Sequence, residues 1–189
     1  MSVSRIALFV MCASALAIRG RAGAINFEGL DDLTILTNQY PGVVFFNATV
    51  LKSQFSLNEG DFPPRSGENV ASNLSGDMLL TFKPEVESFT AYFTYTTQIK
   101  VIALDSTATQ VDTSTALFTE NTASSGNPPN EIFNVSSAAG ITFIRIDSAG
   151  GMFTIDDIRF TSIPEPASMG VTGAVLLILG VVRKRRVRR

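Results

Sequence analysis

Between residues 25 and 161, apolar and polar residues alternate with a period of two, and no stretch has a convincing helical period. The clearest case is the segment 88–96, in which Phe, Ala and Tyr alternate with Ser, Thr and Tyr. This pattern predicts an antiparallel strand with one buried face and one solvated face. The predicted core face carries Phe89, Ala91, Phe93 and Tyr95, and the other face carries Ser88, Thr90, Tyr92 and Thr94.

Nine further segments have the composition of strands, and turn signals rich in Gly, Pro and Asn separate them. Ten short strands with regular punctuation predict an all-β fold, an antiparallel β-sandwich of jelly-roll type. The segment 53–77 is the least regular and contains Pro63-Pro64, so we expect a long loop region there. The predicted strands are 24–28, 43–46, 49–52, 78–82, 88–96, 100–104, 115–118, 132–135, 141–146 and 152–160.

The first 24 residues have the pattern of a cleaved signal peptide. Arg5 precedes an apolar run at 6–18 that is too short for a comfortable membrane span. Because the segment 22–24 reads Ala-Gly-Ala, we expect signal peptidase and the export machinery to release a domain, 25–161, that starts at Ile25. An uncleaved N-terminal helix is the alternative, since two arginines precede the cleavage pattern.

The segment 167–182 carries no charge and predicts a single transmembrane helix. Its sixteen residues would make a helix of about 24 Å, and flanking arginines that snorkel can bridge the difference from the roughly 30 Å hydrocarbon core. Basic residues beside a span stay cytoplasmic, so we expect the domain outside and the tail inside. The alternative for the segment 167–182 is a buried core helix, and the alternative for the basic tail is a nucleic-acid or nuclear address. The basic tail, 183–189, contains Arg183, Lys184, Arg185, Arg186, Arg188 and Arg189.

Pro164, Glu165 and Pro166 lie just before the predicted span. Proline fixes φ and favours extended backbone in the residue before it, so a processing enzyme could bind this stretch in a cleft. Together with Ile163, the apolar helix and the Arg-rich tail, this motif makes 162–189 closely resemble the PEP-CTERM sorting signal of Gram-negative and related bacteria. The resemblance implies recognition by an exosortase, a membrane transpeptidase, in a bacterium that makes extracellular polysaccharide. It also implies a protein held first in the inner membrane and then placed at the cell surface or in the extracellular matrix.

Charge is distributed unevenly along the chain. The formal net charge is −2, but the segment 25–163 holds sixteen acidic and only six basic residues. An acidic domain repels phosphate backbones, so nucleic acid is not an expected partner. Cys12 is the one cysteine and there is no histidine, so a chain cleaved after the signal peptide has no thiol and no disulfide.

Two patches of the domain resemble bacterial secreted jelly-roll domains that are similar to carbohydrate-binding modules. The patches are INFEGL (25–30) with NQYPGVVFFN (38–47), and FTIDDIRFTS (153–162). The resemblance implies that the first and last strands pair and that acids near them hold a structural Ca²⁺. Ile155 and Ile158 would lie on opposite faces of a regular strand, which indicates a β-bulge between them. The predicted ligands are Glu28, Asp31, Asp32 and one of Asp156 or Asp157, and the alternative is an ordinary solvated acidic surface.

Three classes of function can be compared with these patterns: catalysis, polysaccharide binding and a structural or adhesive role. Catalysis has little support. The domain has no histidine or cysteine for the usual acyl-transfer pairs. A glycosidase needs two carboxylates, but a pair such as Glu85 and Glu87 is more typical of a solvated surface. Binding of extracellular polysaccharide would use an exposed aromatic side chain, and Tyr92, on the polar face of 88–96, is the predicted platform. A structural or adhesive surface protein makes the fewest demands on the sequence and is the preferred prediction.

Overall fold

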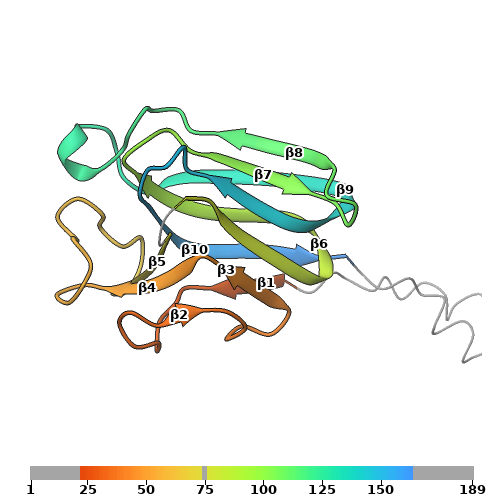
Figure 1. The fold of residues 1–189 in the computed structure, drawn as a ribbon, viewed down its shortest axis with the longest axis horizontal. Coiled ribbons are helices and arrows are strands. Elements are labelled where there is room, and N and C mark those ends of the chain that lie inside the picture. The colour runs from red at the N-terminus through yellow and green to blue at the C-terminus, as the bar shows by residue number, and fades with distance from the viewer. Residues whose placement is uncertain (1–21, 74–75, 164–189) are drawn as a thin grey trace, which may run out of the picture. The chain divides into compact units, whose positions relative to one another are not determined.

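The computed structural model describes residues 22–73 and 76–163 of the 189-residue chain. The predicted sorting motif 164–166, span 167–182 and basic tail 183–189 lie outside the described residues, as do residues 1–21 of the predicted signal peptide. All strand pairs are antiparallel, and Figure 1 shows their arrangement. The strands are β1 (Ala22–Ile25), β2 (Ile35–Leu36), β3 (Val43–Phe46), β4 (Ala48–Lys52), β5 (Asn69–Asn73), β6 (Met78–Tyr95), β7 (Lys100–Leu104), β8 (Gln110–Thr115), β9 (Glu131–Asp147) and β10 (Phe153–Ser162).

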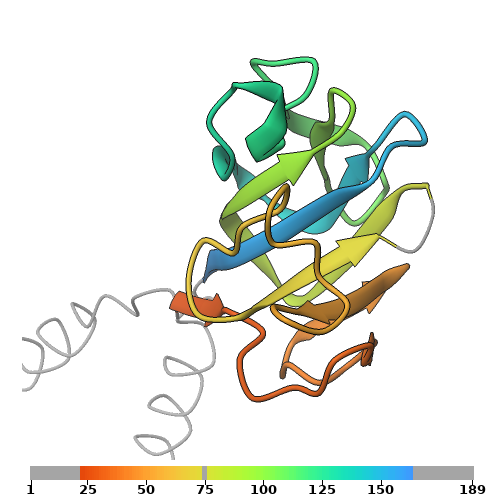
Figure 2. The same cartoon turned by 90° about the vertical axis from the view of Figure 1, so that its left-hand side faces the viewer.

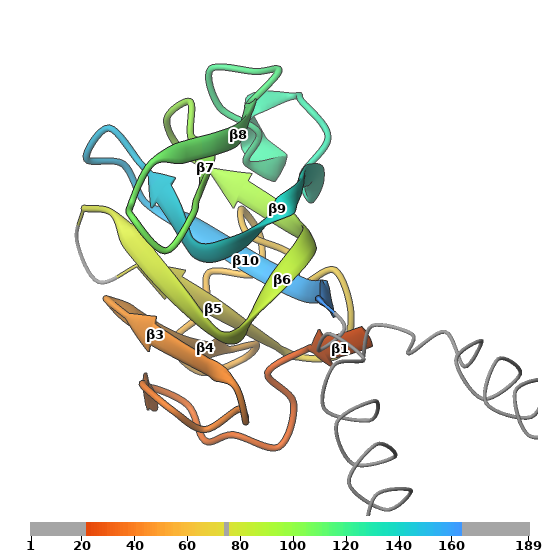
Figure 3. The ribbon, with the colours of Figure 1, turned by 90° about the vertical axis from the view of Figure 1, so that its right-hand side faces the viewer.

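Two long strands, β6 and β9, connect two layers of a sandwich. The first half of β6 pairs with β3, and its second half pairs with β10. β9 follows β6 along both halves, and the register between them shifts twice between Thr81 and Ser88. One layer therefore has the order β2-β4-β5-β10-β6-β9 and the other β3-β6-β9-β7-β8. Figure 3 shows β3, β6, β9, β7 and β8 in front, with β10 and β5 behind them.

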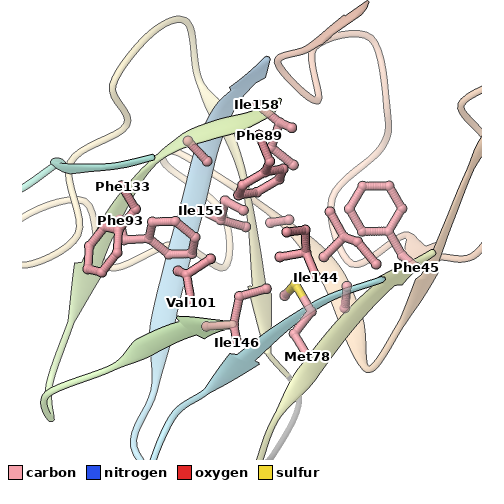
Figure 4. Close-up of a cluster of buried hydrophobic side chains, with 14 of the residues drawn as sticks. Phe45, Met78, Phe89, Phe93, Val101, Phe133, Ile144, Ile146, Ile155 and Ile158 are labelled. Carbon is pink, nitrogen blue, oxygen red and sulfur yellow. The ribbon is translucent and has the colours of Figure 1, made fainter. Parts of the chain in front are cut away.

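The core lies between the two layers and confirms the alternation of the segment 88–96. Phe89, Ala91, Phe93 and Tyr95 all have 0% exposure. They pack against inward side chains of the other layer, such as Ile144, and against Ile155 of β10 (Figure 4). Burial of the Phe89 and Phe93 side chains stabilises the fold by about 1.5–3 kcal/mol each.

The observed elements differ from the predicted ones in three ways. The predicted long loop 53–77 contains β5, a central strand whose five residues are all buried although its sequence is Asn-Val-Ala-Ser-Asn. The last strand before β9 is Gln110–Thr115 rather than 115–118, and Leu117 is exposed. The four predicted strands 78–82, 88–96, 132–135 and 141–146 are halves of the two long strands, because β6 and β9 cross from one layer to the other without ending.

The first and last strands pair, as the resemblance to secreted jelly-roll domains implies. β1 pairs with β10 from Ala22 opposite Thr161 to Ile25 opposite Ile158. Cleavage after Ala24 would therefore remove three of the four residues of β1. Within residues 22–73 and 76–163, no helix is long and apolar enough to cross a membrane.

Candidate functional site

A long loop between β4 and β5, residues 53–68, covers part of the outer face of the β2-β4-β5-β10-β6-β9 layer. Figure 2 shows this loop in front of the blue strand β10. Four apolar side chains of the loop and of the strands beside it form a separate small cluster. The polar residues Thr94 and Thr154 of the same layer are also buried, with 0% and 3% exposure. The clustered side chains are Leu51, Leu57, Phe62 and Val70.

Asp156 binds this loop through its carboxylate. The backbone N–H groups of Arg65 and Ser66 donate hydrogen bonds to its Oδ2 atom, at 2.8 and 3.0 Å. The side chain is 1% exposed. Burial raises the pKa of Asp156 to about 6, although the hydrogen bonds from the backbone of Ser66, Asp157 and Arg65 act in the opposite direction. This acid therefore fixes the position of the loop rather than facing solvent.

The predicted β-bulge is present on β10. The register against β6 shifts between Asp156 and Arg159, and Asp157 has a positive φ of 47°. Ile155 and Ile158 both reach the core because of this extra residue, with 0% exposure each. Asp157 accepts a hydrogen bond from Ser66 Oγ at 2.9 Å, so both acids of the bulge bind the same loop.

Two other acids predicted to bind calcium also accept hydrogen bonds from the chain. Glu28 Oε1 accepts the backbone N–H groups of Glu68 and Asn69, at 3.0 and 2.9 Å. Asp32 Oδ1 accepts the backbone N–H of Lys52 and the hydroxyl of Ser56. Asp31 is exposed. Among residues 22–73 and 76–163, no three acidic side chains come together as a metal site, and the calcium site stays a prediction.

Tyr92 lies on the outer face, as predicted, but its ring is not a free stacking surface. The guanidinium of Arg65 lies over the ring, 4.8 Å from the centroid. The cross-strand neighbours of Tyr92 are Asp156 on β10 and Ile132 on β9, and Ile132 is 49% exposed. The Tyr92 hydroxyl makes no hydrogen bond to the residues that the structure describes. The loop position that Asp156 fixes is thus the position from which Arg65 covers Tyr92.

One row further along β6, Thr90 continues the same face. Its cross-strand neighbours are the exposed Arg159 on β10 and the exposed Asn134 on β9. Thr90 Oγ1 donates a hydrogen bond to Asn134 Oδ1 at 2.7 Å. We call this surface the Tyr92 face, and it consists of Arg65, Thr90, Tyr92, Ile132, Asn134 and Arg159.

The sequence pattern predicts Tyr92 on this face but not the two arginines beside it. Arg159 follows the predicted bulge, but its position opposite Thr90 depends on the register between β10 and β6, which no local pattern gives. No local signal predicts the position of Arg65, because it depends on hydrogen bonds between residues about 90 positions apart. Of the other carboxylates considered, Glu85 accepts a hydrogen bond from Thr142 Oγ1 and Glu87 is exposed.

Comparisons with known proteins find likeness in three dimensions only. No protein family matches the chain, and no curated protein matches it. The K2 cleaved adhesin domain of Lys-gingipain aligns with 75% of this chain and 99% of its own, at 16% identity and a TM-score of 0.46. A DUF4465 family protein from Bacteroides caccae aligns with 76% and 100%, at 8% identity and a TM-score of 0.47. A mutant of the family 29 carbohydrate-binding module CBM29-2 aligns with 76% and 93%, at 15% identity and a TM-score of 0.39. TM-scores of this size do not identify a ligand for this chain.

Proposed function

We propose that the chain is an exported surface or extracellular-matrix protein, sorted by an exosortase, whose non-catalytic β-sandwich has a structural or adhesive role. The observation that carries this proposal is the sequence that follows the folded domain. β10 ends at Ser162, and the backbone N–H of Ile163 donates a hydrogen bond to the carbonyl of Glu85 at 3.0 Å. The segment Pro164-Glu165-Pro166 comes next, followed by the uncharged stretch and the Arg-rich tail.

In this proposal each part of the chain has one task. The N-terminal signal directs export, and the segment 167–182 stops transfer with the tail 183–189 in the cytoplasm. The sandwich, of jelly-roll type, folds outside the membrane. Because proline favours extended backbone in the residue before it, we expect an exosortase to bind the segment 164–166 and to place the domain at the cell surface or in the matrix.

The mass of the mature C-terminus tests this proposal. The protein would be isolated from membrane and extracellular fractions of its native host, beside a variant with Glu165→Ala. We expect a C-terminus near residues 164–166 in the unsubstituted protein, bare or with an added group, and an intact tail in the variant. An unsubstituted chain that ends at Arg189 and occurs only in the inner membrane would instead identify a plain single-span anchor.

The second candidate function is binding of extracellular polysaccharide, and the Tyr92 face is the observation that favours it. It combines an aromatic ring, an exposed aliphatic side chain and hydrogen-bonding side chains on adjacent strands. Affinity electrophoresis in the host's own polysaccharide tests this function. Tyr92→Ala should reduce the retardation of the protein while its melting curve stays cooperative, and unchanged retardation would exclude this face.

A further inference from the structure

We propose that the Tyr92 face binds a polysaccharide that carries carboxylate groups, such as a polyuronate, with Arg65 and Arg159 as the carboxylate ligands. This inference rests on the polysaccharide-binding function proposed above and adds the class of sugar. The argument begins with the charges on this face. The described domain has six basic residues, and two of them lie on this one surface.

Neither Arg65 nor Arg159 forms an ion pair with a described residue. Within residues 22–73 and 76–163, the ion pair between Lys52 and Glu68 is the only one, at 3.2 Å. The guanidinium groups of Arg65 and Arg159 also make no hydrogen bond to the described residues. Guanidinium groups bind carboxylates through two parallel hydrogen bonds, so two unpaired ones favour an anionic ligand.

The two arginines are close enough to serve one ligand. Diagonal neighbours on adjacent antiparallel strands are about 7–8 Å apart, within reach of long side chains. Arg159 is the diagonal neighbour of Tyr92, and Arg65 lies directly over the Tyr92 ring. Stacking on the ring and the two backbone hydrogen bonds to Asp156 hold Arg65 in place before a ligand arrives, which lowers the entropy lost on binding.

The rest of the face suits a sugar rather than a small anion. Ile132 offers an exposed apolar surface beside Tyr92, against which the C–H groups of a sugar ring can pack. Asn134 uses its Oδ1 atom to accept from Thr90, and its amide NH₂ has no partner among the described residues. The Tyr92 hydroxyl is similarly unpaired there, so donors for sugar hydroxyls lie beside the two cations.

The two acids of the bulge on β10 leave both guanidinium groups free to bind a ligand. Asp156, the cross-strand neighbour of Tyr92, and Asp157 accept hydrogen bonds from the loop, and neither forms an ion pair with an arginine of the described residues. At physiological ionic strength, charges further away than about 8 Å are largely screened.

The test uses the full chain in a mild non-ionic detergent, titrated calorimetrically with polygalacturonate and, separately, with its fully methyl-esterified form. We expect binding to the acidic polymer and at least about tenfold weaker binding to the ester, since each lost charged hydrogen bond weakens binding by about tenfold or more. Arg159→Gln and Arg65→Gln should each weaken binding to polygalacturonate by a similar factor. Both residues are exposed, so the variants should fold.

Arg145→Gln is the matched control, because Arg145 is also exposed and lies on the other layer, on the β7 side of β9. It should bind polygalacturonate like the unsubstituted chain.

Equal loss of binding in Arg145→Gln, or equal binding of dextran sulfate and polygalacturonate, would overturn the inference in favour of general attraction of polyanions. Equal binding of the methyl-esterified polymer would overturn the acidic class of ligand but leave the proposed polysaccharide-binding function standing. Self-association that Arg159→Gln abolishes would identify a second copy as the occupant. Binding of neither polymer would overturn the inference, whereas the C-terminal mass separately tests sorting.

Discussion

At the residue scale, several carboxylates of this domain act as acceptors for main-chain N–H groups of loops. Asp156 and Glu28 each accept two such groups on a single oxygen atom. Loop amides have no strand partner, and an unsatisfied buried N–H group costs free energy comparable to a lost hydrogen bond. Four of the acids predicted to bind calcium, Glu28, Asp32, Asp156 and Asp157, therefore bind the loop 53–68 directly, whereas Asp31 is exposed.

Replacing Asp156 by Asn should flatten the dependence of stability on pH. Burial raises the pKa of Asp156 from 3.8 to about 6 in the folded chain, so folding takes up a proton between these values. The free energy of unfolding contributed by this group is therefore highest at low pH and falls as pH rises through that window. The difference is on the order of 2–3 kcal/mol at about 1.4 kcal/mol per pKa unit. Urea unfolding between about pH 4 and pH 7 measures this slope.

Asp105→Asn is the control for that experiment. The hydroxyl of Thr107, together with backbone N–H groups of Thr109 and Thr107, lowers the pKa of Asp105. Its contribution is present at neutral pH and is lost only as pH falls through the lowered pKa, so the slope between about pH 5 and pH 7 should not change. An identical slope for the unsubstituted chain and Asp156→Asn would contradict the raised pKa.

Calcium should leave the melting temperature of the protein unchanged. Glu28, Asp32 and Asp156 already accept hydrogen bonds from the chain, and no three acids converge among the described residues. A ligand present at about 100 times its Kd would stabilise the folded state by about 2.7 kcal/mol, which melting curves detect easily. Curves recorded with calcium and with EDTA should coincide, and a rise with calcium would support the metal site predicted from the sequence.

At the element scale, the loop 53–68 and the strand β10 depend on each other. The loop binds Asp156 and Asp157, and Asn130, just before β9, donates a further hydrogen bond to the carbonyl of Pro63 at 3.0 Å. Hydrogen bonds from these two separate segments thus help to determine the loop conformation. That conformation places Arg65 over Tyr92, so the proposed binding surface is a product of loop packing.

Gly67→Ala should loosen this loop. Gly67 has a φ of +60°, and an added Cβ would lie 2.3 Å from Glu28 Oε1, the atom that binds the backbone N–H groups of Glu68 and Asn69. We expect a loss of about 1–3 kcal/mol and faster cleavage within 53–68 under limited proteolysis. Gly126→Ala shares the positive φ, at +84°, but has nothing within 4 Å of the added Cβ. Equal effects of the two substitutions would show that the contact with Glu28 is unimportant.

At the scale of the whole molecule, the two ends of the domain meet. β1 and the end of β10 pair side by side, and the chain leaves the domain directly into the predicted sorting motif. Gly23 packs closely under Phe160, since a Cβ on Gly23 would lie 2.2 Å from Cζ of the ring. The predicted export cleavage after Ala24 would therefore change the strand next to the segment that an exosortase would bind.

A chain that starts at Ile25 should be less stable than one that starts at Ala22. The shorter chain lacks the partners of Thr161, Phe160 and Arg159 on β1. Each strand hydrogen bond contributes about 0.5–1.5 kcal/mol, so a loss of roughly 1–2 kcal/mol is expected. Thermal melting of the two chains measures the difference. Coincident curves would mean that β1 adds nothing to stability.

The sequence by itself determined the all-β class and the core side of the main strand. It also indicated the bulge on β10, because Ile155 and Ile158 need the same face. Such signals are local, since they depend on the period of side chains along one strand. The sequence did not predict the strand β5. Its Asn and Ser side chains are buried because they bind main-chain groups of distant segments, and Asn69, for example, donates hydrogen bonds to the carbonyls of Phe27 and Leu30.

Only the tertiary structure decided what the acids and the aromatic residue of the site contact. The sequence placed Tyr92 on the outer face, but it did not show that Arg65 covers the ring or that Asp156 binds the loop that carries Arg65. These contacts join residues far apart in the chain, and their geometry depends on the path of a loop with no periodic pattern. Local alternation therefore defined the sandwich, whereas long-range hydrogen bonds defined the surface that it presents.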